Sequence, residues 1–190
     1  MFARQFRSAA GFGLILCLSS SVAAMSVLPG CASSNRATEV TKPARHGYYA
    51  DKIVVKKSQR RLYLMRDGKP FRTYRVSLGI NPVGPKQYRG DNRTPEGRYT
   101  IDWRNPRSKF YKALHISYPS SNDRIRAYRK GWDPGGSIMI HGEPNGSRFS
   151  GLRDAVYKED WTQGCIAVSN LALDEIWQYV LDGTPIEILP

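Results

Sequence analysis

The chain has 190 residues, of which 41% are hydrophobic and 24% charged, and its formal net charge at pH 7 is +13. This length allows one domain with a substantial hydrophobic core. The positive charge suggests an anionic partner, but the basic residues are scattered along the chain and no nucleic-acid-binding motif occurs. Nucleic acid is therefore excluded as the expected partner.

The first thirty residues have the features of a secretory signal peptide, because two arginines precede an apolar segment over residues 9–18. That segment is shorter than the roughly 20 apolar residues of a membrane-spanning helix, so we expect its removal. The sequence LPGC at residues 28–31 resembles a bacterial lipobox, although Pro29 stands where a small residue is usual. It predicts a lipid on Cys31, and the absence of aspartate at Ala32 resembles lipoproteins of the outer membrane. Ordinary cleavage near Ala24 is the alternative.

The predicted organisation is a signal peptide over residues 1–30, a flexible polar tether over residues 31–47 and a folded domain over residues 48–190. The first thirty residues contain two arginines and no acidic residue, so their loss lowers the net charge by two, to +11. We expect a protein of the periplasm or cell envelope, anchored there by its lipid. A basic protein in that location is attracted to an anionic wall polymer.

Residues 52–118 have the short, alternating apolar runs of strands and turns, which predict an antiparallel sheet. Asp67-Gly68 is a hairpin signal between two of these strands. A long loop rich in proline and glycine follows residue 79 and precedes a strand near residues 99–103. The turn GDNRTPEG in this loop has a structural role, in which Asp91 bonds local amides or Arg93.

The second half mixes strands with two helices. We expect a strand over residues 113–119, a short helix capped near Ser121 and a short strand that ends at His141. A longer helix is expected to begin with Asn170 as its N-cap and to end at Gly183, with Leu171, Leu173, Ile176, Trp177 and Val180 as its apolar face. Residues 185–189 close the domain as a strand.

Cys165 has no disulfide partner once Cys17 leaves with the signal peptide and Cys31 is lipidated. A thiol in an oxidising compartment is either buried and inert or retained because it reacts. A neighbouring imidazole lowers the pKa of a thiol and protonates a leaving amine, so His141 and Cys165 suffice for acyl transfer. Gly164 allows a tight turn, in which backbone N–H groups face an oxyanion. The alternative is a structural histidine and a buried cysteine, since both are common.

Four segments are similar, in the same order, to those of the L,D-transpeptidase catalytic domain family (YkuD-like): SLGINPVGPKQYRGDNRTPEGRYTI, ISYPSSNDR, IMIHGEPNG and DWTQGCIAVSN. The resemblance covers nearly all of residues 52–190. It implies a mainly β fold, with β-sandwich-like sheets and a few short helices, that carries a cysteine site under a loop. It implies no cofactor, and the histidines and Cys165 lack the short spacing of a zinc site.

The resemblance assigns the nucleophile to Cys165 and the general acid/base to His141, whose ring the carbonyl of Gly142 orients. Gly164 supplies backbone to the oxyanion hole, and Thr162 matches the Ser/Thr of the family motif. Two positions depart from the family pattern: Gln163 replaces a second histidine and Ala167 replaces asparagine or arginine. The resulting motif DWTxGCIAxxN resembles a subgroup that contains murein L,D-endopeptidases as well as transpeptidases.

The implied activity is cysteine-dependent acyl transfer on peptidoglycan stem peptides, in wall cross-linking or remodelling that affects cell shape. A thioester forms at the L-centre of meso-diaminopimelate and passes to an amine of a second stem or to a lysine of a wall-anchored lipoprotein. Thr162, Gln163, Arg93 and Lys86 are predicted to contact the substrate, and a solvated basic surface is the alternative for the loop cations. Two other functions stay open: hydrolysis of such links by an L,D-endopeptidase or carboxypeptidase, and a wall-binding lipoprotein with a degenerate centre.

Overall fold

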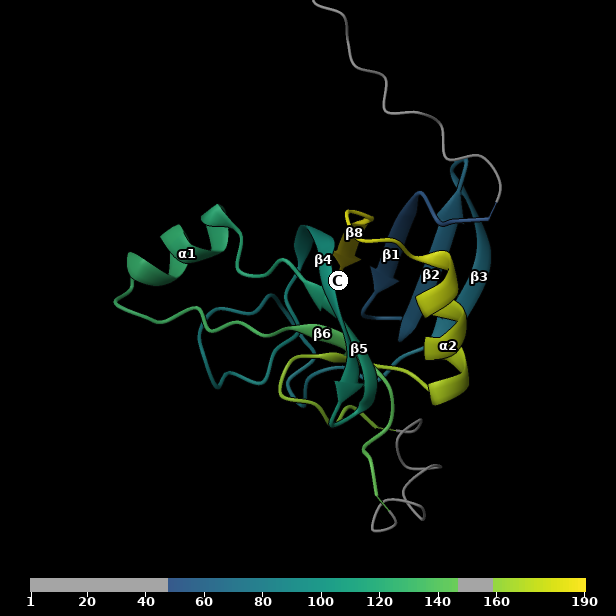
Figure 1. Ribbon diagram of the computed structural model, residues 1–190. Coiled ribbons are helices and arrows are strands. Elements are labelled where there is room, and N and C mark those ends of the chain that lie inside the picture. The colour runs from purple at the N-terminus through teal and green to yellow at the C-terminus, as the bar shows by residue number, and fades with distance from the viewer. Residues whose placement is uncertain (1–47, 147–158) are drawn as a thin grey trace, which may run out of the picture. The chain divides into compact units, whose positions relative to one another are not determined.

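A computed structural model describes residues 48–146 and 159–190. The predicted signal peptide, the tether and Cys31 lie outside these residues. The strands are β1 (Lys52–Lys56), β2 (Arg61–Arg66), β3 (Lys69–Arg75), β4 (Gly97–Ser108), β5 (Tyr111–Ile116), β6 (Met139–His141), β7 (Ile166–Ala167) and β8 (Pro185–Leu189), and the helices are α1 (Ser121–Tyr128) and α2 (Asn170–Tyr179). The mainly β fold class is confirmed, and Figure 1 shows how the strands and helices are arranged.

The strands form one mixed sheet in the order β3-β2-β1-β8-β4-β5-β6-β7. The pairs within residues 52–118 are antiparallel, as predicted, and Asp67 and Gly68 form the tight turn between β2 and β3 with φ angles of 50° and 73°. The pairs β1–β8 and β6–β7 are parallel, which the sequence did not predict. The long strand β4 pairs first with β8 and then with β5, so it connects the two halves of the sheet.

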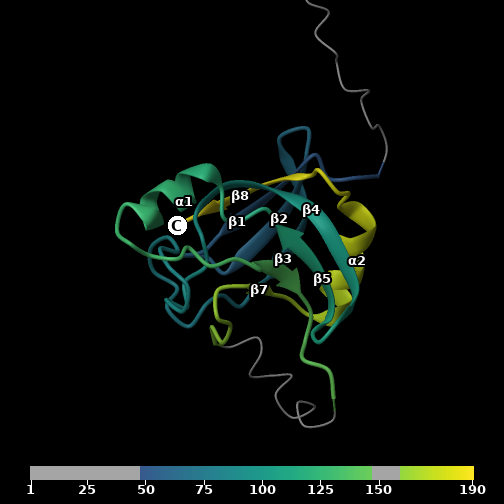
Figure 2. The same ribbon diagram turned by 60° about the vertical axis from the view of Figure 1, so that its left-hand side comes forward.

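One core cluster contains side chains from both halves of the sheet and from α2. Leu173 and Ile176 of α2 are fully buried in it. On the β5 side, the hydroxyl of Tyr111 and the ammonium of Lys112 both donate to the carboxylate of Asp174, which fixes α2 beside β5 (Figures 1 and 2). The helix also contacts β3, where the Tyr74 hydroxyl donates to the Glu175 carboxylate, so apolar burial and polar contacts together fix α2 against both halves of the sheet.

The two helices differ from their predicted limits. Ser120 and Ser169, each one residue earlier than expected, are the N-caps of α1 and α2. The helix α2 ends at Tyr179 rather than at Gly183, and Leu171, which we placed on its apolar face, is 80% exposed. Neither helix in the described ranges has the length and apolar character needed to cross a membrane.

Candidate active site

His141 and Cys165 come together because β6 and β7 are neighbouring parallel strands. Ile140 pairs with Ile166 and His141 with Ala167, so Cys165 directly precedes β7 beside the chain that leads into His141. Both side chains line one cavity of about 740 Å³. The 24 positions that separate them in the sequence therefore do not separate them in the fold.

The imidazole of His141 is buried and oriented by the backbone. Its Nδ1 lies 2.7 Å from the carbonyl oxygen of Gly142, so an Nδ1–H donates there and Nε2 keeps a lone pair. The rings of Phe110 and Trp161 pack against it, with centroids 4.6 and 5.6 Å away. Burial lowers the pKa of His141, although the Gly142 hydrogen bond opposes this shift. The ring is therefore a neutral base at pH 7.

The thiol of Cys165 is also neutral in this environment. Its S–H donates to the carbonyl oxygen of Ser137 at 3.6 Å. Burial raises the pKa of Cys165, and a hydrogen bond from the Met139 N–H and the charge of Lys86 only partly oppose it. Ser137 has a positive φ of 56°, which is strained for a residue other than glycine. The Ser137 carbonyl thus accepts the hydrogen bond of the thiol until a base removes its proton.

The turn before Cys165 requires glycine. Gly164 has a φ of 128°, and a Cβ there would lie 2.6 Å from the carbonyl oxygen of Arg93. Its N–H donates to Thr162 Oγ1 at 3.1 Å, and the same hydroxyl donates to the Cys165 carbonyl at 2.8 Å. Thr162 therefore supports this turn from a buried position, and it also lines the catalytic cavity.

The hydrogen bonds of this turn revise the predicted oxyanion hole. The Gly164 N–H, which we expected to face the oxyanion, already has the Thr162 hydroxyl as its acceptor. Within residues 48–146 and 159–190, the Cys165 N–H has no acceptor. The indole N–H of Trp161, another residue of the cavity wall, is buried and also lacks one in the described part of the chain. The Cys165 N–H is therefore a donor that a substrate oxygen could use.

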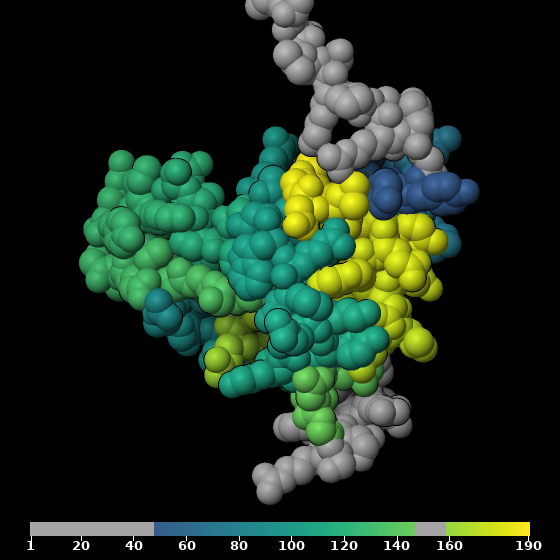
Figure 3. Space-filling model, in the orientation of Figure 1, coloured from purple at the N-terminus to yellow at the C-terminus, as the bar shows by residue number. Residues whose placement is uncertain are grey.

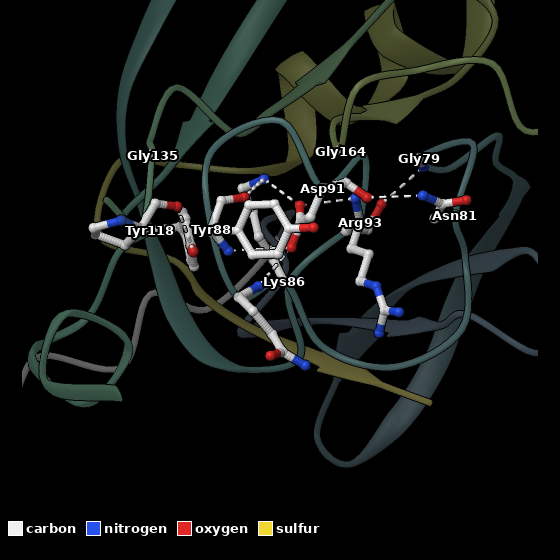
Figure 4. Close-up of polar contacts among 12 residues, drawn as sticks. Gly79, Asn81, Lys86, Tyr88, Asp91, Arg93, Tyr118, Gly135 and Gly164 are labelled. Carbon is white, nitrogen blue, oxygen red and sulfur yellow. Dashed lines mark hydrogen bonds and ion pairs between the residues drawn. The ribbon is translucent and has the colours of Figure 1, made fainter. Parts of the chain in front are cut away.

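The other predicted substrate contacts fall in different places. Gln163 is exposed and lines the cavity. Lys86 does not line it: the side chain is 4% exposed and its ammonium contacts the Asp91 carboxylate at 2.7 Å. Arg93 approaches Gly164 with its backbone, while Figure 4 shows its side chain directed away from Gly164. Lys86 and Arg93 therefore make contacts within the fold and do not line the catalytic cavity.

Asp91 organises the long loop, as the sequence predicted for the GDNRTPEG turn. Its carboxylate accepts hydrogen bonds from the backbone N–H groups of Gln87, Tyr88 and Arg93 and from the Lys86 ammonium. The loop then returns to the sheet, where Thr94 Oγ1 accepts from the Gly79 N–H. The segment behind Gly164 is consequently fixed by buried polar contacts.

Sequence reasoning missed the basic end of the β4–β5 hairpin. Arg107 and Lys109 line the cavity together with Asn105 and Phe110, and neither cation has an acidic partner in the described ranges. We expected a strand only near residues 99–103, whereas β4 continues to Ser108. The basic sequence RNPRSK that follows Trp103 was the available signal.

A cysteine and a buried histidine in one cavity of a mainly β domain define the class of a candidate thiol acyltransfer site. No group of three or more histidine, cysteine, aspartate or glutamate side chains among the described residues is placed to hold a metal ion. The family model YkuD, described as L,D-transpeptidase catalytic domain, matches residues 50–188. The chain therefore belongs to this family of catalytic domains.

Individual relatives agree with this assignment. The Escherichia coli K12 protein named "Putative L,D-transpeptidase YafK" is 31% identical over 157 residues, which are 78% of this chain and 55% of that protein. The helical cell shape determining protein Pgp2 of Campylobacter jejuni has 28% identity and a TM-score of 0.53, over 72% of this chain and 46% of Pgp2. Bd1075 of Bdellovibrio bacteriovorus shares the fold, with 24% identity and a TM-score of 0.52, over 74% of this chain and 48% of Bd1075. The chain spans about half the length of the relatives it matches.

Proposed function

We propose that the chain modifies peptidoglycan by cysteine-dependent acyl transfer on stem peptides. The observation that supports this most directly is the shared cavity of Cys165 and His141, in which Nδ1 of the imidazole is held by Gly142 and Nε2 is left to act as a base. The family of the catalytic domain supplies the substrate class. The names of relatives connect that class with cell shape, since Pgp2 is a cell shape determining protein.

The first half-reaction forms a thioester. His141 Nε2 takes the proton of the Cys165 thiol as sulfur attacks the carbonyl carbon at the L-centre of meso-diaminopimelate. The carbonyl oxygen becomes an oxyanion, which the Cys165 N–H can stabilise. When the carbon–nitrogen bond breaks, the imidazolium returns its proton to the departing amine. Both groups begin neutral, so the proton transfer accompanies attack rather than preceding it.

The second half-reaction resolves the thioester. An amine of a second stem, or a lysine of a wall-anchored lipoprotein, attacks the thioester carbon while Nε2 accepts its proton, and sulfur leaves and is reprotonated. Arg107 and Lys109 line the cavity, and their positive charges support a role in binding stem carboxylates. This assigns them the role that the sequence suggested for Lys86 and Arg93.

Hydrolysis is the second candidate function. Gln163 stands at the cavity wall in the position where the family motif has a second histidine. With water in place of the amine, the same thioester would yield an L,D-endopeptidase or carboxypeptidase. A catalytically degenerate wall-binding lipoprotein is the third, and it requires that Cys165 form no thioester.

We also propose an envelope location, with the chain exported to the periplasm and attached to the outer membrane by a lipid on Cys31. The signal-like residues 1–30 and the lipobox-like LPGC support this. The mass of the mature N-terminus tests it. A diacylglycerol-modified Cys31 is expected, and an unmodified N-terminus that follows Ala24 would refute the lipid anchor.

Purified sacculi distinguish the three activities. The full chain is incubated with sacculi, with and without an added acceptor amine, beside the variant Cys165→Ala. New cross-links or amine adducts that require Cys165 support transfer, while shortened or released stems in the absence of amine indicate hydrolysis. A carbapenem serves as a second probe, because it should add its mass to Cys165. No adduct and no turnover would refute enzymatic acyl transfer.

A further inference from the structure

We propose that a second cavity, between α1 and the long loop, binds carboxylates of the wall polymer outside the catalytic cavity. This inference rests on the proposed function. The cavity has a volume of about 320 Å³, and its walls are formed by Pro85, Gln87, Arg126, Arg129, Lys130 and Trp132. None of these residues lines the catalytic cavity, so the two sites are distinct. Its volume lies at the lower end of the range of small-molecule sites.

The charge of this cavity is positive and only partly neutralised. Arg126 pairs with the buried carboxylate of Asp123. Arg129 makes no side-chain hydrogen bond or ion pair with any described residue, and Lys130 reaches only the amide oxygen of Gln87, at 3.3 Å. A guanidinium and an ammonium are therefore available to an anion, and their hydrogen bonds to a carboxylate are charge-assisted.

The cationic wall is held in place before any ligand binds. The backbone N–H groups of Lys130 and Trp132 both donate to the carbonyl of Ala127, at 2.9 and 3.0 Å, in a turn that Gly131 makes with a φ of 70°. The Lys130 ammonium lies over the Trp132 ring, 4.6 Å from its centroid, and Tyr88 packs its ring edge-on against the same indole at 5.0 Å. The ammonium thus has a defined position, which lowers the entropy cost of binding.

The opposite wall is tied to this turn. The side chain of Arg89 contacts the Asp133 carboxylate at 2.7 Å, and its backbone N–H donates to the Asp133 carbonyl at 2.8 Å. The loop that carries Arg89 also packs behind Gly164, as Figure 4 shows for its Asp91–Arg93 segment. The long loop and the turn after α1 are therefore joined beside this cavity by a backbone hydrogen bond and an ion pair.

A polymeric substrate can reach both cavities. Ser137, in the wall of the catalytic cavity, follows Trp132 by five positions, so the chain between them spans at most about 18 Å. A wall polymer carries many stems with free carboxylates, whereas an isolated stem fills one site only. Binding at the second cavity would raise the local concentration of further stems at Cys165. Figure 3 shows α1 projecting from the body of the domain, where a large polymer has access to it.

The test compares two double variants of equal charge. Arg129→Ala with Lys130→Ala removes the two available cations. The matched control, Arg75→Ala with Arg124→Ala, removes two exposed arginines that line neither cavity. Each pair is made in the full chain with Cys165→Ala for binding to purified sacculi, and with Cys165 intact for turnover of a soluble stem tetrapeptide.

We expect the first pair to weaken binding to sacculi by at least about tenfold and the control by less than about twofold. Turnover of the soluble tetrapeptide should remain within twofold, roughly, of the parent for both. Amidation of the sacculus carboxylates should remove the difference between the pairs. Equal weakening by both pairs would overturn the site. Binding to vesicles that contain phosphatidylglycerol is measured in the same way, and a loss of binding confined to these vesicles would also overturn the site, because it would indicate a lipid surface.

Failure of the proposed function gives a different pattern. If the parent turns over neither the tetrapeptide nor sacculi, the catalytic proposal fails. The binding comparison in the Cys165→Ala background still reports on the second cavity in that case, because it needs no turnover. Unchanged binding together with normal turnover would refute the second site alone.

Discussion

Replacing Asp91 with asparagine removes the charge that neutralises the buried ammonium of Lys86. The two side chains are 3% and 4% exposed, so water cannot solvate the ammonium that remains. Loss of one partner of a buried ion pair costs about 3–5 kcal/mol. The Asp91 carboxylate also accepts three backbone hydrogen bonds, which an amide cannot all replace because it offers only one oxygen. We therefore expect Asp91→Asn to lower the free energy of unfolding by about 3–5 kcal/mol.

Urea unfolding at pH 7 measures this loss, and thermal unfolding should show a midpoint lower by roughly 10 °C for a chain of this size. The control Asp133→Asn removes a carboxylate from an ion pair that is 58% and 71% exposed, and it should leave the midpoint unchanged. Adding Lys86→Met to Asp91→Asn should recover part of the loss, because it removes the uncompensated charge. A loss below about 1 kcal/mol for the single variant would refute the reasoning.

The pH dependence gives a second check on Asp91. Burial by itself raises the pKa of this carboxyl, but hydrogen bonds from the Gln87 N–H, the Lys86 ammonium and the Arg93 N–H outweigh it and hold the pKa below its usual value. A carboxyl with a depressed folded-state pKa stabilises the protein fully above about pH 4, and this contribution is lost as the pH falls through the folded-state value. The stability difference between parent and Asp91→Asn should therefore shrink only in strong acid. A difference that disappears already at pH 5 would contradict this.

Three further predictions concern the catalytic turn. Because burial raises the pKa of Cys165, iodoacetamide should alkylate this thiol slowly at pH 7 and faster only above about pH 9. Peptide mass spectrometry can follow the alkylation rate, and a midpoint of its pH profile below about pH 8 would contradict this expectation. Because burial lowers the pKa of His141, the acid limb of thioester formation should have its midpoint below about pH 6.5, and a higher midpoint would argue against a neutral base. Gly164→Ala should lower the unfolding free energy by at least about 1–3 kcal/mol, since its Cβ would meet the Arg93 carbonyl, and an unchanged urea midpoint would refute that contact.

Local features of the fold were predictable from the sequence. The Asp67-Gly68 hairpin needs only the preference of these residues for positive φ, and the structure has it. The N-caps of α1 and α2 were each predicted one residue late. In both helices two adjacent residues can cap, Ser120 with Ser121 and Ser169 with Asn170, and the fold uses the first of each pair. The parallel pairing of β1 with β8 joins segments about 130 residues apart, so no short-range pattern specifies it.

The candidate site was predictable in residue type and less so in contacts. Cys165 and His141 were proposed together, and the fold places both in one cavity. The loop cations were misplaced, because a sequence shows a positive charge without showing which carboxylate neutralises it. Lys86 has a buried acidic partner, whereas Arg107 in the β4–β5 hairpin has none among the described residues. Tertiary pairing, rather than charge itself, decides which cations line the cavity.

A lone cysteine in the exported location that we propose is exposed to oxidants, and the structure indicates how its reactivity is limited. Oxidation and exchange proceed through the thiolate. Burial raises the pKa of Cys165, its S–H donates to the Ser137 carbonyl, and the neutral His141 supplies no positive charge to form an ion pair. The thiolate fraction is therefore small until a carbonyl lies close enough for attack and proton transfer to occur together. The same burial that makes the thiol a poor free nucleophile preserves it for the substrate.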